Sequence, residues 1–472
     1  MSTCGSQLPG TPYALNKSYS GTTFFDAGEW GFGTQDWTGG VSEYVNRSTA
    51  LHERLVEAHE QHAILRTGEL GKPYRRKSVR LTTTRSWMYG LIALRFSHVP
   101  FGCGVWPAFW TNAASGHWPG GGEVDILELA NYGPSKMSFH TGGRKRCVLE
   151  PGLVRDCLQR LPIGLERWLG FDCFTDYRKA LMGCAPAMPA MSMTGPEWSA
   201  SPGVLAAEWT ARHVKIFYFP EAYGLPADLR DDRPTPDAWD SHLVAFFPFA
   251  ASDELSPGSC PDAASLLEPQ SIVLNIALCG NWASSTFRTE GPRGLLGLRG
   301  SCASTPGRGP DSLSKRTPNF TLDAARGADD KTCLVVEQGT SSPHYRKDCC
   351  VQHVTGTSWN GDDAFWNISW LKVYQQPGGG VEGERAGKRP THEPPPPEPT
   401  IHTGLALKQL ALIAAAAAAG VLLSRRGAAV RAATCAAKRA AEAEGASERY
   451  TPSTNYPSTV PWYPPPWYPP PP

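Results

Sequence analysis

Apolar and polar residues alternate in short runs along the first 376 residues, and this period of two predicts β-strands. Gly, Pro and Asp separate the runs, as turns between strands require. We expect the strands between residues 78 and 130 to be consecutive antiparallel neighbours. The clearest runs are residues 78–83, 90–96, 136–141, 203–210, 213–220, 271–278 and 366–374.

The longest apolar runs identify strands that are covered on both faces. Residues 213–220 and 271–278 are apolar at most positions, which is typical of a strand packed between two layers. No helical period is visible before residue 400. The pattern therefore predicts an all-β fold, a two-sheet antiparallel β-sandwich over residues 13–376, preceded by a leader at residues 1–12.

The composition changes sharply after residue 376. Residues 377–403 are rich in Pro and Gly and predict an extended linker. Residues 404–424 are almost uncharged and approach the ~20 residues that a membrane helix needs, although a soluble Ala-rich helix is the alternative. Arg425 and Arg426 then predict a single-pass protein with its large domain on the extracellular face of a membrane or in the cell wall. Residues 425–472 form a Pro/Tyr/Trp-rich tail, predicted to be disordered or to be a polyproline ligand.

Charge and cysteine usage narrow the partners and the compartment. The 45 basic and 44 acidic residues nearly cancel, so nothing favours nucleic acid as a partner. The 13 cysteines show no zinc-type spacing, which favours disulfides in an oxidising compartment. Sequons at Asn16, Asn46, Asn319 and Asn367 agree with a secreted glycoprotein. Residues 1–15 nevertheless show no signal peptide, and we expect a monomer.

Residues 122–130, Gly-Glu-Val-Asp-Ile-Leu-Glu-Leu-Ala, carry the candidate chemistry. In a regular strand Glu123 and Asp125 share one face and Glu128 lies on the other. A β-bulge would return Glu128 to the face of the other two. Two carboxyl groups on one face, one ionised and one protonated, are the groups that cleave glycosidic bonds. A solvated helical turn or an edge strand with surface charges is the plain alternative.

Aromatic residues surround the acidic stretch. Trp106, Trp110 and Trp118 precede it, and Trp282 follows a later strand. Aromatic rings stack on the apolar faces of sugars, so these residues are candidates for substrate binding, although core packing is the common role of a Trp. His140 lies in the strand after the acids, where a structural histidine is the commoner interpretation.

The segments 106–110, 123–128, 139–141 and 279–283 resemble glycoside hydrolase family 16, in particular the fungal laminarinase-type endo-1,3(4)-β-glucanases. The resemblance covers about residues 13–376. It implies a jelly roll of the concanavalin A-like lectin/glucanase type, whose concave sheet holds a β-glucan. It also implies that His140 contributes to the cleft. No metal or cofactor is expected in the reaction; some relatives hold a structural calcium ion, but no ligand set for one is readable.

The resemblance also implies a role for each acid. Glu123 corresponds to the nucleophile and Glu128 to the acid/base, while Asp125 supports the pair and is expected to hydrogen-bond Glu123. The expected reaction is hydrolysis of 1,3- or mixed 1,3(4)-β-glucan with retention. A cell-wall transglycosylase with the same acids and a non-catalytic glucan-binding surface protein are the alternatives.

Overall fold

A computed structural model shows two units, residues 1–389 and 390–472, and every described residue lies in the first. The described residues are 11–116, 118–142, 146–150, 154, 170–176, 181–185, 193–249, 260–261, 263–287, 302, 346, 348–357, 359–377 and 382–384.

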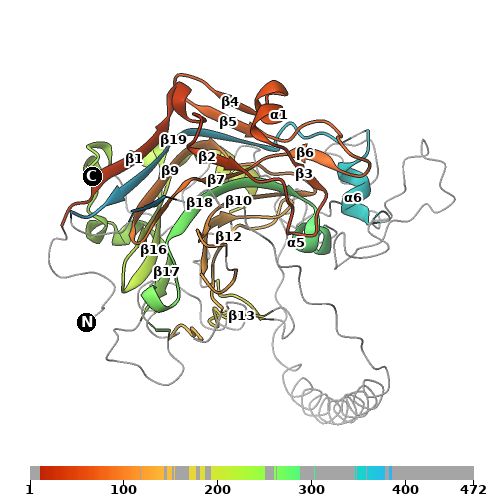
Figure 1. The fold of residues 1–472 in the computed structure, drawn as a ribbon. Coiled ribbons are helices and arrows are strands. Elements are labelled where there is room, and N and C mark those ends of the chain that lie inside the picture. Colours follow the sequence, from red (N-terminus) through yellow and green to blue (C-terminus); the bar gives the residue numbers. More distant parts are fainter. Residues whose placement is uncertain are drawn as a thin grey trace, which may run out of the picture. The chain divides into compact units, whose positions relative to one another are not determined.

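Two antiparallel eight-stranded sheets form the domain, one stacked on the other (Figure 1). The first sheet has the strand order β17-β16-β15-β9-β19-β5-β4, with β1 also paired to β19. Its strands are β1 (Ala14–Ser20), β4 (Val56–Ala58), β5 (Ala63–Arg66), β9 (Gly90–His98), β15 (Gly203–Trp209), β16 (His213–Pro220), β17 (Leu243–Pro248) and β19 (Phe365–Gln375).

The second sheet has the order β12-β11-β10-β18-β7-β2, and β8 joins it at the end of β18. Its strands are β2 (Trp30–Phe32), β7 (Arg80–Thr83), β8 (Arg85–Trp87), β10 (Val105–Ala113), β11 (Glu123–Glu128), β12 (Lys136–His140), β18 (Gln270–Leu278) and β20 (Glu382–Glu384). Two small pairs complete the strands, namely β3 (Ser42–Tyr44) with β6 (Arg76–Ser78), and β13 (Thr175–Asp176) with β14 (Leu181–Met182).

The core lies between the two sheets. Phe139 of β12 meets Phe247 of β17 with ring centroids 5.8 Å apart, so the two sheets touch through aromatic rings. Fully buried Trp366 of β19 donates from Nε1 to the main-chain oxygen of Asn275 on β18 at 3.2 Å. Removing a buried aromatic side chain of this kind costs about 3–5 kcal/mol, so these contacts fix the spacing of the sheets.

The outer face of the first sheet is also covered, which explains the doubly apolar pattern of residues 213–220. The segment with α4 (Ala227–Arg230), η6 (Pro236–Ala238) and η7 (Asp240–His242) supplies the cover. Its buried Trp239 packs edge-on against Phe217 and Phe219 at 5.4 and 5.0 Å. The packing between two layers that was predicted for residues 213–220 is therefore confirmed, whereas residues 271–278 lie in β18, which turns one face toward the core and the other toward the candidate site described below.

The predicted sandwich is confirmed, and two details of the prediction were wrong. Strand β9 pairs with β15 and β19 in the first sheet, so it is not a neighbour of β10, which pairs with β11 and β18. Short helices also occur before residue 400: α1 (Arg47–His52), α3 (Gly195–Ala200), α5 (Gly280–Ser285), α6 (Cys349–Val354), η1 (Gly21–Thr23), η5 (Glu221–Tyr223) and η8 (Ala263–Ser265). Six residues or fewer cannot display a 3.6-residue period over more than two turns.

Beyond residue 376 only a few residues are described. Within the range read as a linker, β20 pairs with β8, so the second sheet includes backbone as far as Glu384. The candidate membrane helix at 404–424 and the tail at 425–472 lie outside the described residues. Among the helices that are described, none has the length and apolar character needed to cross a bilayer.

Disulfides were predicted from the cysteine spacing, and the described residues contain four complete bridges. The four bridges are Cys103–Cys302, Cys147–Cys260, Cys173–Cys184 and Cys279–Cys350. Three of them join segments 71 or more residues apart in the chain. They therefore restrict the unfolded chain strongly and fasten loops to the sandwich.

Candidate active site

Strand β11 contains the predicted bulge. Against β10, Leu127 pairs with Phe109 while Asp125 pairs with Trp110, so Ile126 is an extra residue with no partner of its own. Ile126 is fully buried, and Glu123 and Glu128 both keep partial exposure. The extra residue resets the alternation of faces and brings Glu128 beside Glu123 and Asp125.

Residues paired across an antiparallel sheet share a face, so the strand register defines which side chains surround the acids. On β12, His140 lies opposite Glu123, Ser138 opposite Asp125 and Lys136 opposite Glu128. We call this side of the second sheet the site face. From β10 and β18 the register adds Trp106, Ala108, Trp110, Asn275 and Ala277 to it.

Asp125 is held by β12. Its Oδ2 accepts a hydrogen bond from Ser138 Oγ and lies 3.1 Å from His140 Nε2. Thr175 Oγ1 lies 3.1 Å from the other ring nitrogen of His140. The partners that the structure gives Asp125 are therefore Ser138 and His140, and the expected hydrogen bond to Glu123 is not among its described contacts.

Glu128 and Glu123 each receive an indole N–H. Trp106 Nε1 donates to Glu128 Oε1 at 2.7 Å, and Trp118 is a hydrogen-bond partner of Glu123. The oxygens of Glu123 and Asp125 and a ring nitrogen of His140 lie within 4.8 Å of one another. The structure thus brings together all three acids and the histidine that the sequence identified.

Burial and crowding of like charges raise the pKa of both glutamates. Burial first and the charge of Asp125 second raise the pKa of Glu128 to about 8, against the opposing effects of Trp106, His140 and Lys136. The same two causes raise the pKa of Glu123 well above its usual range, opposed by His140 and Trp118. The site therefore retains a proton among its carboxyls at neutral pH.

The pKa of His140 is also raised, but for a histidine this favours the charged form. Burial alone lowers its pKa, but the hydrogen bond and charge of Asp125, together with Glu123 and Glu128, raise the pKa to about 9. At neutral pH the ring is thus an imidazolium that offsets one of the three carboxylates. His140 and Asp125 thus form an ionised pair, and Glu123 and Glu128 share a proton beside it. This arrangement is suited to acid/base and nucleophilic chemistry.

Of the four predicted aromatic residues, three are half-buried and one is exposed. Trp106 and Trp282 meet edge to face, with ring centroids 5.5 Å apart, and both are half-buried. Trp110 is also half-buried, and its Nε1 donates to Asn275 Oδ1 at 2.7 Å. Trp118 is 39% exposed. All four residues are at least partly exposed, whereas a core Trp such as Trp366 is fully buried.

Several residues of the site were not identified from sequence. Ser138 lies two residues before His140 in the same strand, so the strand alternation could have indicated it. Asn275 and Arg80, whose guanidinium lies 5.1 Å from the ring centroid of Trp110, come from strands far away in the chain. No local signal connects these two residues with the acids.

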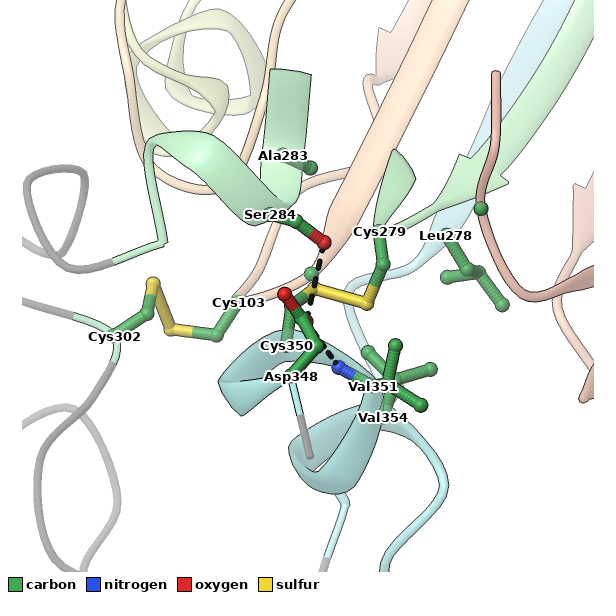
Figure 2. The surroundings of a disulfide bond; sticks show 12 residues. Cys103, Leu278, Cys279, Ala283, Ser284, Cys302, Asp348, Cys350, Val351 and Val354 are labelled. Atoms are coloured by element: carbon green, nitrogen blue, oxygen red, sulfur yellow. Dashed lines mark hydrogen bonds between the residues drawn. A yellow bond between two sulfur atoms is a disulfide. The ribbon is translucent and has the colours of Figure 1, made fainter. Parts of the chain in front are cut away.

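Trp282 is held from behind by covalent and polar contacts. Cys279 precedes α5 with a left-handed φ of 60°, which is unusual for a residue other than Gly, and its disulfide to Cys350 ties this turn to α6. Figure 2 shows this disulfide, with the Ser284 hydroxyl directed at Asp348 at 3.2 Å. The backbone of α5 is thereby fixed behind the Trp282 side chain.

Two groups of metal-ligand type occur among the described side chains. In the first, Cys279 and Cys350 are consumed by their disulfide beside Asp348. In the second, Glu123 and Asp125 surround His140, whose raised pKa leaves no free lone pair for a metal. Neither group fits a metal in this state.

The two-sheet sandwich and the bulged strand with its carboxyl cluster define a jelly-roll domain of the glycoside hydrolase type. Residues 30–311 match the family model described as the XgeA-like, catalytic GH16 domain, and the chain belongs to this family. The resemblance seen in the sequence is confirmed.

Two fungal proteins are among the curated relatives of the chain. The chain is 28% identical over 311 residues to a probable glycosidase of Schizosaccharomyces pombe, covering 64% of this chain and 66% of that protein. It is 26% identical over 383 residues to an endo-1,3(4)-beta-glucanase of Arthroderma benhamiae, covering 78% of this chain and 66% of that one. The chain thus spans slightly less than two thirds of these relatives.

Solved structures give the same fold. Laminarinase 16A of Phanerochaete chrysosporium, solved with 6-O-glucosyl-laminaritriose in its donor and acceptor sites, is 25% identical, with a TM-score of 0.54. An elongating family 16 beta-1,3-glucosyltransferase is also 25% identical, with a TM-score of 0.54. In both comparisons 77% of this chain and 100% of the other are covered.

Proposed function

We propose that the chain is an endo-acting, retaining β-glucanase that hydrolyses 1,3- or mixed 1,3(4)-β-glucan by double displacement. The observation that carries the proposal is the bulge at Ile126, which sets Glu123 and Glu128 on one face with Asp125 between them. The relatives named endo-1,3(4)-beta-glucanase and the laminarinase with glucans in two sites support the substrate class.

In the first step Glu128, in its protonated form, gives its proton to the glycosidic oxygen. A carboxylate oxygen of Glu123 forms a bond to the anomeric carbon while the bond from that carbon to the leaving oxygen breaks. The leaving sugar departs as a neutral alcohol, and a glycosyl ester remains on Glu123. The raised pKa of Glu128 keeps the required proton available near neutral pH.

In the second step Glu128 accepts a proton from water as the water oxygen bonds to the anomeric carbon and the ester bond to Glu123 breaks. Both acids return to their starting protonation states, and the configuration is retained. Imidazolium His140 offsets the charge of Asp125 between them, while Trp106, Trp110, Trp118 and Trp282 offer ring faces to the sugars.

The test uses laminarin and the release of reducing ends. We expect activity in the wild type and none in Glu123→Gln, with an unchanged circular dichroism spectrum. Glu221→Gln, which alters a glutamate of η5 that is paired with Arg95, is the matched control and should keep full activity. Unchanged turnover in Glu123→Gln would contradict the assignment.

A variant pair separates the roles of the two acids. In Glu123→Ala, added azide attacks the anomeric carbon directly, so the product is the inverted α-glycosyl azide. In Glu128→Ala, azide attacks the glycosyl ester, so the product is the retained β-glycosyl azide. The opposite assignment of products would exchange the two roles.

A transglycosylase is the second candidate, because an elongating glucosyltransferase is among the similar structures. In that case a sugar hydroxyl replaces water in the second step. Chromatography of the products distinguishes the two, since only transfer yields oligosaccharides longer than the substrate. A purely glucan-binding protein is disfavoured by the presence of both glutamates.

We also propose that the domain works outside the cell, as a monomer tethered through residues 404–424. The four disulfides support an oxidising compartment. Protease treatment of intact cells tests the orientation: removal of the domain with the tail protected is expected, and a protected domain would contradict the proposal.

A further inference from the structure

Lys136 lies directly opposite Glu128 in the register of β11 and β12. Its backbone pairs with Glu128, and its side chain is exposed on the site face. The ammonium nitrogen lies 4.3 Å from the ring centroid of Trp282, well within the range of a cation–π contact. The ammonium therefore approaches a ring that the sequence suggested for sugar stacking.

A continuous path of contacts leads from Lys136 back to Glu128. Trp282, under the ammonium, meets Trp106 at a centroid distance of 5.5 Å and an interplanar angle of 86°. Trp106 then donates its indole N–H to Glu128 at 2.7 Å. The Trp106 side chain thus touches the acid/base on one side and the ring held by Lys136 on the other.

The path has a rigid support behind it. The disulfide from Cys279 ties the start of α5, and Asn131 Nδ2 donates to the main-chain oxygen of Ala283 at 3.0 Å. The backbone at Trp282 is therefore fixed, and its ring can move only by side-chain rotation. Lys136 and Trp106 are the described contacts that limit this rotation.

We propose that Lys136 is a positioning residue for the reaction: it clamps Trp282 against Trp106 and thereby holds the Trp106 indole on Glu128. This inference rests on the proposed role of Glu128 as acid/base. Lys136 does not touch the reacting atoms in this arrangement. It acts through the two rings and through its charge.

The positive charge of Lys136 changes the pKa of Glu128 in a definite direction. The charged groups that act on Glu128 are Glu123 and Asp125 from its own strand, and His140 and Lys136 from β12. Lys136 opposes the rise in the pKa of Glu128. Without the ammonium the carboxyl keeps its proton to higher pH, so the alkaline limb of the activity profile should move upward.

The experiment compares Lys136→Met with Lys136→Arg. Methionine keeps a chain of similar length without charge, and arginine keeps a cation over the ring. Lys17→Met, which removes a lysine that pairs with Glu29 and lies over Tyr19 in the first sheet, is the matched control. The readouts are kcat, KM and the pH profile of kcat/KM on laminarin.

We expect Lys136→Met to shift the alkaline limb upward by about half a pH unit and to lower kcat severalfold. Lys136→Arg should restore both, and Lys17→Met should change neither. A Lys136→Met profile that superimposes on the wild type would overturn the proposal. Loss of activity with equal effects in Met and Arg variants would show a merely structural role and also overturn it.

A second readout does not depend on turnover. With the glutamate δ-carbons labelled by ¹³C, the Glu128 signal is assigned by its loss in Glu128→Gln, and its pKa is titrated directly. A rise in Lys136→Met that is absent in Lys136→Arg and Lys17→Met supports the clamp, and an unchanged pKa overturns it. Wild-type inactivity on glucan would instead overturn the proposed function, so the two failures are distinguishable.

Discussion

Both sheets bury charged side chains on the face turned away from the shared core, but they do so in different ways. In the first sheet Glu208 accepts a hydrogen bond from the Tyr13 hydroxyl at 3.0 Å and lies 2.9 Å from a ring nitrogen of His213. Fully buried Lys215 pairs with Asp240 at 3.4 Å. Each charge there has a partner of opposite sign or a hydrogen-bond donor. The Trp239 segment covers the neighbouring surface of the same face.

The second sheet places three carboxyls against one imidazolium and the exposed ammonium of Lys136, and it leaves Glu123, Glu128 and His140 half-exposed. Charges that are matched and covered stabilise a fold, whereas unmatched like charges raise one another's pKa and keep protons available. An excess of charge of one sign thus distinguishes the reactive face from the structural one. Variants on the two faces should therefore affect different properties.

The largest effect is expected from Glu128→Gln on the site face. Activity on laminarin should fall by about 10²- to 10⁴-fold, because the amide cannot donate the proton to the leaving oxygen. An aryl glucoside with a good leaving group needs no such proton, so its first step should be much less affected. The thermal midpoint should not fall, since a crowded carboxyl is replaced by a neutral amide. A large fall would show that Glu128 stabilises the fold, as the charged residues of the first sheet are expected to do.

Glu208→Gln should give the converse result. We expect a loss of about 1–3 kcal/mol in the free energy of unfolding, because the contacts to Tyr13 and His213 lose a charged acceptor. Activity per folded molecule should be unchanged. Denaturant titration with a parallel laminarin assay measures both, and a selective loss of activity would remove the distinction between the faces.

The pH dependence of stability should come from the site face. Glu128 titrates at about 8 in the folded protein against an ordinary value of 4.5, and His140 at about 9 against 6.5. Burial lowers the pKa of His353 to about 4, so this histidine acts in the opposite direction below about pH 6.5. From about pH 6.5 to 9 the folded state binds more protons than the unfolded state, so stability should fall as pH rises through this range. Denaturant curves over this range should show a shallower decline in Glu128→Gln, and an equal decline would locate the effect elsewhere.

The smallest effect is expected from Trp110→Phe. The ring remains but its hydrogen bond to Asn275 is lost, and one such bond contributes about 1 kcal/mol, or about fivefold in KM. Initial rates across laminarin concentrations measure this change. Trp366→Phe, which alters a fully buried ring in the core, should instead lower the thermal midpoint and leave KM unchanged.

The sequence was informative where the information is local. The bulge followed from the spacing of Glu123, Asp125 and Glu128 alone, because side-chain alternation is a property of the strand itself. The partner Asn275, and the exclusion of β9 from the site sheet, depend on which distant strands pair. Pairing is set by packing of the whole sandwich, which no window of the sequence contains.

The charged residues of the first sheet illustrate the same limit. Residues 213–220 read as an apolar strand, yet Lys215 within them is fully buried with a carboxylate partner from η7. A single polar residue in an apolar run gives no indication of its partner. The site face was predictable because its chemistry is concentrated in one strand, and the structural network was not because it is shared among four segments.

The bulge at Ile126 has a consequence for how the strand tolerates changes in length. Deleting Ile126 would leave Glu-Val-Asp-Leu-Glu, a regular strand in which the three acids still alternate onto the same face. Deleting Val124 instead would turn Glu123 away from the other two. A lineage carrying this domain can therefore lose one codon at the bulge and keep its acids aligned, whereas loss of a codon between Glu123 and Asp125 divides them between opposite faces.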